Sequence, residues 1–172
     1  MGLLASFPIF IIIFIVGLFD TGSPIFVQER VGRNKKPFLL IKFRTMKLDT
    51  ESVASHLAST SSITRLGGFL RNTKLDELPQ LWNVLKGEMS LVGPRPNLLS
   101  QKELIEERVR LGVYDVRPGI TGLAQLSDID MSMPKLLAET DIKMIRCMSL
   151  GKYFSYILQT VIGRGAGDRV NS

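Results

Sequence analysis

The 172-residue chain has only one cysteine, Cys147, and one histidine, His56. A single cysteine cannot form an internal disulfide bond, so the sequence lacks a disulfide framework and suits a reducing compartment. The two residues lie far apart and without the spacing of zinc ligands, which argues against a zinc site. Because apolar residues surround Cys147, we expect a small buried side chain there and no catalytic role. We expect His56 to be exposed and non-catalytic.

Internal repeats are also lacking, and the only biased stretch is a short Ser/Thr cluster within residues 51–62. A chain of this length can bury one moderate core. We therefore expect a single folded domain at residues 23–172, preceded by a membrane-associated hydrophobic helix at residues 1–22. The expected fold class is α+β, mostly helical, with a small antiparallel β-hairpin.

Charged side chains are absent from residues 1–19, and the stretch from Ile9 to Leu18 is almost continuously apolar. A spanning helix needs roughly 20 apolar residues, and Pro8 interrupts this run, so it is marginal as a full span. No lysine or arginine precedes the run, which argues against a signal peptide. A buried helix of a soluble domain is the remaining alternative.

Basic residues give the chain a formal net charge of +6 and gather just after the apolar segment. This cluster comprises Arg30, Arg33, Lys35, Lys36, Lys42, Arg44 and Lys47. Each cation beside an anionic leaflet contributes about 1 kcal/mol, which predicts contact with the cytoplasmic membrane surface. No nucleic-acid-binding motif accompanies the cluster, so we expect no nucleic-acid partner. Residues 152–162 carry aromatic and aliphatic side chains at helical spacing, which fits either an interfacial helix or ordinary core packing.

Hydrophobic periodicity places the remaining elements. Two strands, Ile25–Glu29 and Phe38–Phe43, are expected to form the hairpin, and residues 49–62 a loop that could hold a short helix at Val53–Ala58. Helices are expected at Ile63–Asn72, Asp76–Lys86, Leu98–Leu111, Pro134–Met148 and Lys152–Ile162. Asn97 is a candidate N-cap for the third of these helices.

A carboxylate pair, Asp76 and Glu77, stands at the start of the expected helix Asp76–Lys86. The helix is predicted from an apolar stripe made of Leu78, Leu81, Trp82 and Leu85. Neighbouring helical residues point about 100° apart, so one carboxylate could face a substrate while the other holds a metal. The helix dipole favours ionised carboxylates, as nucleophilic attack on phosphorus requires. Judged by their position alone, however, these two acidic residues are better explained as a helix cap than as a catalytic pair.

Three arginines surround this pair in the sequence. Arg71 lies five residues before Asp76, whereas Arg95 and Arg117 lie in segments rich in proline and glycine, Gly93–Pro96 and Val116–Gly122. Proline and glycine constrain the backbone, which would hold these guanidinium groups in place before a ligand arrives. Planar cationic forks suit phosphate oxygens, although each arginine could instead bridge loop carbonyls. Together with the carboxylate pair, they favour a phosphate site.

These segments, taken in order, resemble the bacterial sugar transferases, the monotopic polyprenyl-phosphate phosphoglycosyl transferases. The resemblance runs from about Ser23 to the C-terminal region and rests on Lys42–Met46, Leu75–Gly87, Ser90–Pro96 and Arg117–Gln125. It implies transfer of a sugar-1-phosphate from a UDP-sugar to polyprenyl phosphate, the first membrane step of an envelope glycan. It also implies an inner-membrane location with the catalytic domain facing the cytoplasm.

The resemblance further implies residue roles. Asp76 would attack the β-phosphate to form an aspartyl-phosphosugar intermediate and release UMP, and Glu77 would help hold Mg²⁺. Arg71, Arg95 and Arg117 would contact phosphate or nucleotide. A bound Mg²⁺ fits this set, because hard oxygen ligands and positive charge must offset the repulsion between a carboxylate and a diphosphate.

The N-terminus departs from the family pattern, in which a re-entrant helix breaks at a Ser/Pro kink. Only five residues precede Ser6, and Phe7 separates it from Pro8. We expect a shortened member, a fragment, or a chain whose start lies upstream. Two alternatives in function stay open: an Mg²⁺-dependent phosphohydrolase, and a membrane-bound nucleotide-sugar-binding protein without turnover. The oligomeric state is open, with a homo-oligomer among the alternatives.

Overall fold

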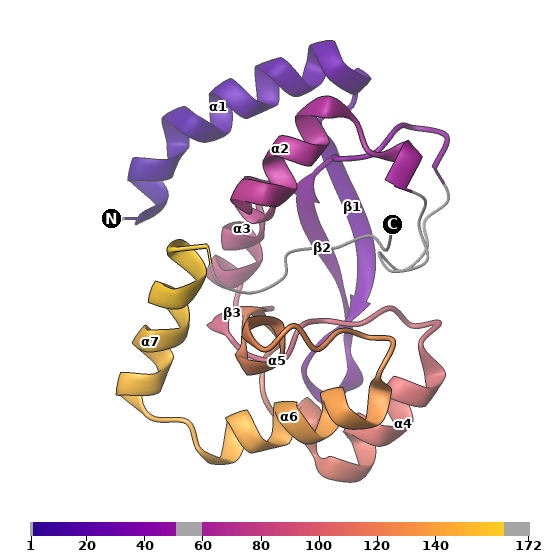
Figure 1. Cartoon of the computed structure of the whole chain (residues 1–172), viewed down its shortest axis with the longest axis vertical. Coiled ribbons are helices and arrows are strands. Elements are labelled where there is room, and N and C mark those ends of the chain that lie inside the picture. The colour runs from indigo at the N-terminus through magenta and orange to yellow at the C-terminus, as the bar shows by residue number, and fades with distance from the viewer. Residues whose placement is uncertain (1, 51–59, 164–172) are drawn as a thin grey trace. The chain divides into compact units, whose positions relative to one another are not determined.

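The computed structural model describes residues 2–50 and 60–163, with side chains for residues 7–50 and 61–163 (Figure 1). The elements, with η for a 3-10 helix, are α1 (Gly2–Thr21), β1 (Ile25–Val31), η1 (Arg33–Lys35), β2 (Pro37–Phe43), η3 (Thr60–Ser62), α2 (Arg65–Thr73), η4 (Leu75–Glu77), α3 (Gln80–Leu85), β3 (Ser90–Val92), α4 (Lys102–Leu111), η5 (Val113–Asp115), β4 (Gly119–Thr121), α5 (Leu123–Leu126), α6 (Pro134–Arg146) and α7 (Leu150–Val161). The expected α+β class, mostly helical with one hairpin, is confirmed. The helix expected at Val53–Ala58 and the exposure expected of His56 lie outside the described residues.

The described chain divides into two compact units, each of which is described by itself. The first unit contains residues 2–28, 40–50 and 60–83, and the second contains residues 29–39 and 84–163. The β1–β2 hairpin supplies its base to the first unit and its tip to the second. Of the predicted site residues, Arg71, Asp76 and Glu77 therefore belong to the first unit, and Arg95 and Arg117 to the second. The boundary expected after residue 22 stays a prediction.

The core of the first unit joins α1, β2 and α2 through Ile13, Phe43 and Leu70. The rings of Phe10 and Phe43 lie 4.9 Å apart between centroids, which fixes α1 against the hairpin. α1 continues through Pro8 as one helix, and much of its remaining surface is apolar and exposed. No helix in residues 2–50 or 60–163 is long and apolar enough to cross a membrane.

The basic cluster expected at the membrane surface is not all exposed. Arg30 and Lys42 are 6% and 7% exposed, so the expectation that they face the membrane is wrong. Lys42 Nζ lies 5.6 Å from the centroid of the Phe26 ring, and the Arg44 guanidinium carbon lies 5.4 Å from the same centroid. Cation–π contacts of this kind stabilise charges that face the protein. The exposed members of the cluster are Arg33, Lys35, Lys36 and Lys47.

The second unit contains a parallel strand pair that the sequence did not predict. Ser90 of β3 pairs with Gly119 of β4, and Val92 pairs with Thr121. The helices pack through a buried cluster of Leu104 on α4, Ala124 on α5 and Leu137 on α6.

The last helix, α7, is joined to the strand pair by two hydroxyl contacts. The Tyr153 hydroxyl lies 3.1 Å from Ser90 Oγ, and the Thr160 hydroxyl lies 2.6 Å from Thr121 Oγ1. Its other face is apolar and exposed, with Leu150, Phe154, Leu158 and Val161. An interfacial role for that face stays a prediction. Cys147, expected to be buried, is exposed because it ends α6 and faces away from the core.

Candidate active site

The predicted carboxylate pair lies directly after a sharp reversal at the end of α2. Thr64 caps the start of this helix, and its Oγ1 accepts a hydrogen bond of 2.9 Å from the Gly67 amide. Lys74 caps the end of the helix, and its left-handed backbone (φ 58°, ψ 16°) lets its amide donate back to the Arg71 carbonyl. Such a turn stops the helix within one residue. The chain therefore passes at once into η4, which carries Asp76 and Glu77.

Both carboxylates are buried, Asp76 to 2% and Glu77 to 7% exposure. The expected single helix Asp76–Lys86 is wrong, because the pair lies in a 3-10 turn before α3 begins at Gln80. Pro79 has no amide hydrogen to donate to an α-helical partner. Just after Pro79, the Trp82 amide donates a hydrogen bond of 3.0 Å to the Pro79 carbonyl, which is the i to i−3 pattern of a 3-10 turn. At three residues per turn the two side chains point about 120° apart, which leaves room for separate tasks.

The expected apolar stripe is also not the buried face of α3. Trp82 and Leu85 are 58% and 62% exposed, whereas Gln80 and Asn83 are buried. Asn83 Oδ1 accepts a hydrogen bond of 3.2 Å from the Ile41 amide on β2. The helix therefore turns Asn83 toward the hairpin, where its side chain satisfies a partly buried strand amide that an apolar residue would leave unpaired.

Arg71 is oriented by a buried threonine that sequence reasoning did not single out as a site residue. The Arg71 Nε donates a 2.9 Å hydrogen bond to Thr45 Oγ1, and Thr45 is only 3% exposed. α2 lies in backbone contact with this position, because a Cβ added to Gly67 would lie 2.0 Å from the Thr45 carbonyl oxygen. Arg71, Asp76 and Glu77 are thus carried on one rigid helix-and-turn segment. The sequence did offer one indication of a role for Thr45, because this residue lies in the segment Lys42–Met46, one of those that carry the family resemblance.

In the second unit, the parallel strand pair ties the two proline-flanked arginine segments together. The Ser90 amide donates to the Pro118 carbonyl at 2.8 Å, and the Gly119 amide donates to the Pro94 carbonyl at 2.9 Å. A Cβ on Gly119 would lie 2.0 Å from the Gly93 amide nitrogen, so the two backbones meet with no space between them. The structure therefore brings the segments that carry Arg95 and Arg117 side by side.

Both arginines remain accessible while their neighbours are buried. Within residues 92–98, Arg95 alone is not fully buried, and Arg117 is exposed beside the buried Pro118. The Arg117 Nη2 lies 3.6 Å from the position that a Cβ on Gly87 would take, so the guanidinium lies over that glycine. The expectation that proline and glycine hold the two guanidinium groups themselves in place stays a prediction.

A buried polar cluster beneath the Arg95 segment was missed by sequence reasoning. Arg108 on α4 and Asp141 on α6 are each 1% exposed, and Arg108 Nη2 donates to Asp141 Oδ2 at 2.7 Å. Burial raises the pKa of the Asp141 carboxyl, and the Arg108 charge opposes that shift. The signal was available, since Asp141 stands among Leu137, Ala138 and Met144 on the apolar face of its helix.

Asn97 completes this cluster instead of capping α4. The expected N-cap is wrong, because α4 is preceded by Gln101 and Asn97 is fully buried. Its Oδ1 accepts hydrogen bonds of 2.9 Å from Arg108 Nη1 and from the Tyr114 hydroxyl. Burial raises the pKa of Tyr114, so this hydroxyl remains a donor.

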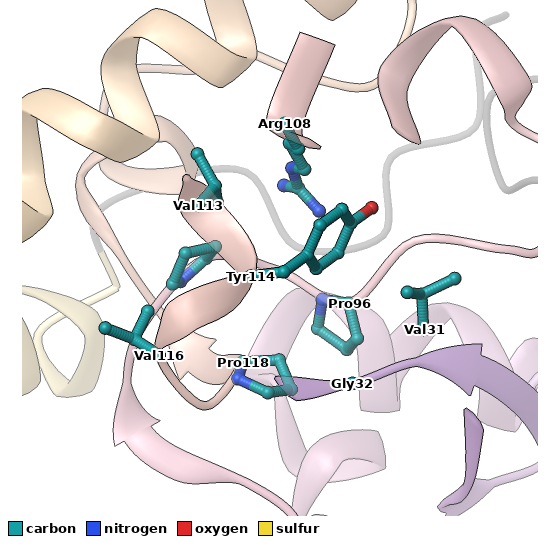
Figure 2. A pocket seen from close by; sticks show the side chains of 9 residues that line it. Val31, Gly32, Pro96, Arg108, Val113, Tyr114, Val116 and Pro118 are labelled. Carbon is teal, nitrogen blue, oxygen red and sulfur yellow. The ribbon is translucent and has the colours of Figure 1, made fainter. Parts of the chain in front are cut away.

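A small pocket opens beside the cluster, lined in part by Arg108, Tyr114, Pro96 and Pro118 (Figure 2). Its volume is about 10 Å³, which suffices for about one water molecule. It is therefore too small to receive a sugar or a nucleotide. The predicted phosphate-contacting residues, not this pocket, define the candidate site.

Metal binding by Glu77 stays a prediction. No group of three or more acidic, histidine or cysteine side chains suited to a metal occurs among the residues that the structure describes. The donor chemistry of Asp76 and Glu77 still fits Mg²⁺, which is commonly held by one or two carboxylates together with substrate phosphates.

The chain is similar to several bacterial proteins of known or assigned activity. The chain is 36% identical over 155 residues to the UDP-glucose:undecaprenyl-phosphate glucose-1-phosphate transferase of Caulobacter vibrioides, a match covering 85% of this chain and 58% of the relative. It is 42% identical over 134 residues to the UDP-galactose-lipid carrier transferase of Erwinia amylovora, covering 68% and 28%. It is 34% identical over 156 residues to the UDP-N-acetylgalactosamine-undecaprenyl-phosphate N-acetylgalactosaminephosphotransferase of Aeromonas hydrophila, covering 86% and 36%. The chain thus spans between about a quarter and three fifths of these relatives. The bacterial sugar transferase family matches residues 1–164, and the chain belongs to that family.

Proposed function

We propose that this chain transfers a sugar-1-phosphate from a UDP-sugar to polyprenyl phosphate. The single observation that carries the proposal is the burial of Asp76 and Glu77 on the turn that follows α2, in the same rigid segment as Arg71. Family membership and the names of the relatives, which include transfer of glucose-1-phosphate to undecaprenyl phosphate, support the same reaction.

The reaction proceeds in two displacements at one phosphorus atom. A carboxylate oxygen of Asp76 attacks the β-phosphorus of the donor, and the bond to the bridging oxygen breaks, so that UMP leaves with the electron pair. An oxygen of polyprenyl phosphate then attacks the aspartyl-phosphosugar, and the Asp76 carboxylate leaves. The products are a polyprenyl-diphosphate sugar and the regenerated carboxylate.

Positive charge has to offset the repulsion between an anionic nucleophile and an anionic donor. We assign that task to Arg71, held by Thr45 in the first unit, and to Arg95 and Arg117, held by the strand pair in the second. Glu77 would hold Mg²⁺, which supplies Lewis-acid stabilisation of phosphate oxygens when bound. The burial of Asp76 also limits the access of water to the intermediate, which favours transfer over hydrolysis.

We further propose that the chain acts at the cytoplasmic face of the inner membrane, in contact with its lipids. The exposed apolar side chains of α1, including Ile12 and Phe19 at 61% and 88% exposure, support insertion of that helix into one leaflet. Exposed cations at Arg33, Lys35 and Lys36 would face anionic headgroups.

The test is to reconstitute the full chain in lipid vesicles with Mg²⁺ and polyprenyl phosphate. Each of UDP-glucose, UDP-galactose and UDP-N-acetylgalactosamine is then offered in turn, and UMP and lipid-linked sugar are measured. We expect Asp76→Asn to reduce both products at least about a thousand-fold, because the amide is nearly isosteric but is not an anionic nucleophile. The matched control is Asp49→Asn, which makes the same change at an exposed position of the first unit and should retain full turnover.

The products separate the alternatives. UMP with free sugar phosphate would indicate a phosphohydrolase, and UDP-sugar binding without UMP release would indicate a binding protein. Substantial turnover by Asp76→Asn would remove Asp76 from the role of nucleophile. Omission of Mg²⁺ in the presence of a chelator tests the metal, and unchanged turnover would reject its role.

A further inference from the structure

The segment that carries Arg95 has no regular secondary structure, yet four successive carbonyls in it are held. The Pro94 carbonyl accepts from the Gly119 amide at 2.9 Å, and the Asn97 carbonyl accepts from the Val31 amide at 2.9 Å. Between them, the carbonyl of Arg95 accepts from Arg108 Nη1 at 2.9 Å, and that of Pro96 accepts from Arg30 Nη1 at 3.2 Å. The donors come from β4, β1 and α4. The segment is therefore fixed from three sides of the second unit.

The two prolines explain why the segment 94–97 is held through its carbonyl groups. Pro94 and Pro96 have no amide hydrogen, so two positions of the segment have no backbone donor with which to anchor it. At these two positions the carbonyl is the only backbone group that can form a hydrogen bond, and buried carbonyls require donors. Arg108 supplies a side-chain donor to the carbonyl of Arg95, which lies between the two prolines and whose own side chain remains accessible.

The contacts of Arg108 suit it to holding the protein's own backbone and not to binding a ligand. It is 1% exposed, and Nε and Nη2 both donate to Asp141 Oδ2, at 3.1 and 2.7 Å. Its Nη1 donates to the Arg95 carbonyl and to Asn97 Oδ1, both at 2.9 Å. A guanidinium carries five donors on three nitrogens and can reach all of these acceptors, whereas a lysine ammonium carries three donors on a single nitrogen and cannot span them. The Arg108 charge is thus matched by Asp141 and directed into the protein.

We infer that Arg108, oriented by Asp141 and Asn97, is a positioning residue that sets the Arg95 guanidinium for the donor diphosphate by holding the Arg95 carbonyl. This inference rests on the proposed function for the identity of the ligand. It does not rest on that function for the fixation of the segment, which can be measured without turnover.

The alternative is that the Arg108–Asp141 pair only stabilises the fold. Buried ion pairs can often be replaced by apolar residues of similar volume with little or no loss of stability. The double variant Arg108→Met with Asp141→Leu removes the charge pair and the donor to the Arg95 carbonyl together. A matched control exists on the surface of the same helix, where Arg110 Nη2 pairs with Glu107 Oε2 at 2.6 Å. Arg110→Met with Glu107→Leu makes the same chemical change away from the segment.

We expect the buried double variant to melt close to the wild type while its KM for the UDP-sugar rises about ten-fold and kcat falls, since misplacement by about 1 Å can cost about a hundred-fold in rate. A smaller folded fraction would lower the apparent kcat alone and leave KM unchanged. In an Arg95→Ala background the buried double variant should add less than about a two-fold further loss, because both changes act through one guanidinium. Losses that multiply, or an unchanged KM, would overturn the inference.

If the double variant Arg108→Met with Asp141→Leu does not fold, a second variant still tests the inference. Arg108→Lys keeps a charge for Asp141 but gives up the donors on three nitrogens, so we expect the same rise in KM at smaller cost to stability. Unchanged kinetics in a folded Arg108→Lys protein would contradict the assigned role.

Hydrogen–deuterium exchange of the full chain keeps this test separate from that of the proposed function. The Arg108 variants should exchange the amides of residues 92–98 faster, with no change in α7. If the wild type releases no UMP from any donor, the proposed function fails, but faster exchange would still support the fixation. Unchanged exchange at residues 92–98 would refute it.

Discussion

The contact between Gly119 and Gly93 allows a sharp test of how the two arginine segments are held together. An added Cβ at Gly119 would lie 2.0 Å from the Gly93 amide nitrogen and 2.5 Å from its Cα. Both neighbours are backbone atoms, so no side chain can rotate away. Gly119→Ala must therefore move the strands β3 and β4 apart.

The expected cost follows from the hydrogen bonds that such a movement breaks. To reach an ordinary contact of about 3.4 Å the strands must separate by about 1.4 Å, which is too far for normal hydrogen bonds. The three bonds at risk donate from Ser90, Gly93 and Gly119 to carbonyls 2.8 to 2.9 Å away. At about 1 kcal/mol each, their loss lowers the free energy of unfolding by about 3 kcal/mol. For a chain of this size that corresponds to a fall in Tm of about 6–12 °C.

The assay is thermal unfolding of the reconstituted chain, followed by circular dichroism, beside the KM for the UDP-sugar. The matched control is Gly151→Ala on α7, where an added Cβ meets no atom within 4 Å. Alanine is the better helix former, so the control should melt at the same temperature or slightly higher. A Gly119→Ala protein that melts and turns over like the wild type would refute the claim that close backbone contact holds the arginine segments.

Two further predictions concern the polar partners in each unit. Thr45→Val keeps the side-chain shape but removes the acceptor of Arg71 Nε, so the KM for the UDP-sugar should rise roughly three- to ten-fold in steady-state assays with little change in Tm; an unaltered KM would show that Thr45 does not orient Arg71. Burial already raises the folded-state pKa of Asp141 above its ordinary value of 3.8, and Arg108→Met removes the charge that opposes this shift. The favourable contribution of a group with a raised folded pKa is present at low pH and lost as pH rises through that pKa, so the variant should lose Tm relative to the wild type as the pH rises above the ordinary value of 3.8. If the single variant Arg108→Met and the double variant Arg108→Met with Asp141→Leu lost the same amount of Tm as the pH rises, this reasoning would be contradicted.

Amphipathic pattern predicted the long elements better than the short ones. The helices α4, α6 and α7 lie within a few residues of their expected ranges, because apolar residues repeat along each of them with helical period. The pair β3–β4 was missed, since strands of three residues are too short to show a period. Its register depends on the meeting of Gly93 and Gly119, which are distant in the sequence.

The candidate site was predicted by residue type and misjudged in conformation. Asp76 and Glu77 were expected in the first turn of a helix, but the left-handed Lys74 and the missing amide of Pro79 produce a 3-10 turn. The apolar stripe from Leu78 to Leu85, which predicted that helix, consists of half-buried and exposed side chains. The buried face of α3 instead carries Asn83, which accepts a hydrogen bond from the Ile41 amide of β2.

The role of the buried charges could have been suspected from the sequence. Asp141 interrupts an apolar face, and a charge in that position needs a partner. The identity of that partner could not be read, because Arg108 lies on a different helix and pairs with it only after the chain folds.

The parallel pairing of β3 with β4 has a consequence for the order in which the protein is made. Ser90 and Gly119 pair only after α4 and η5 have formed the crossover between them, because parallel strands need a long connection. Non-local pairing of this kind closes a large loop and tends to occur late in folding. During synthesis, the segment with Asp76 and Glu77 therefore emerges from the ribosome before the two proline-flanked arginine segments can be aligned. A nascent chain would carry these two carboxylates for some time before Arg95 and Arg117 are brought side by side.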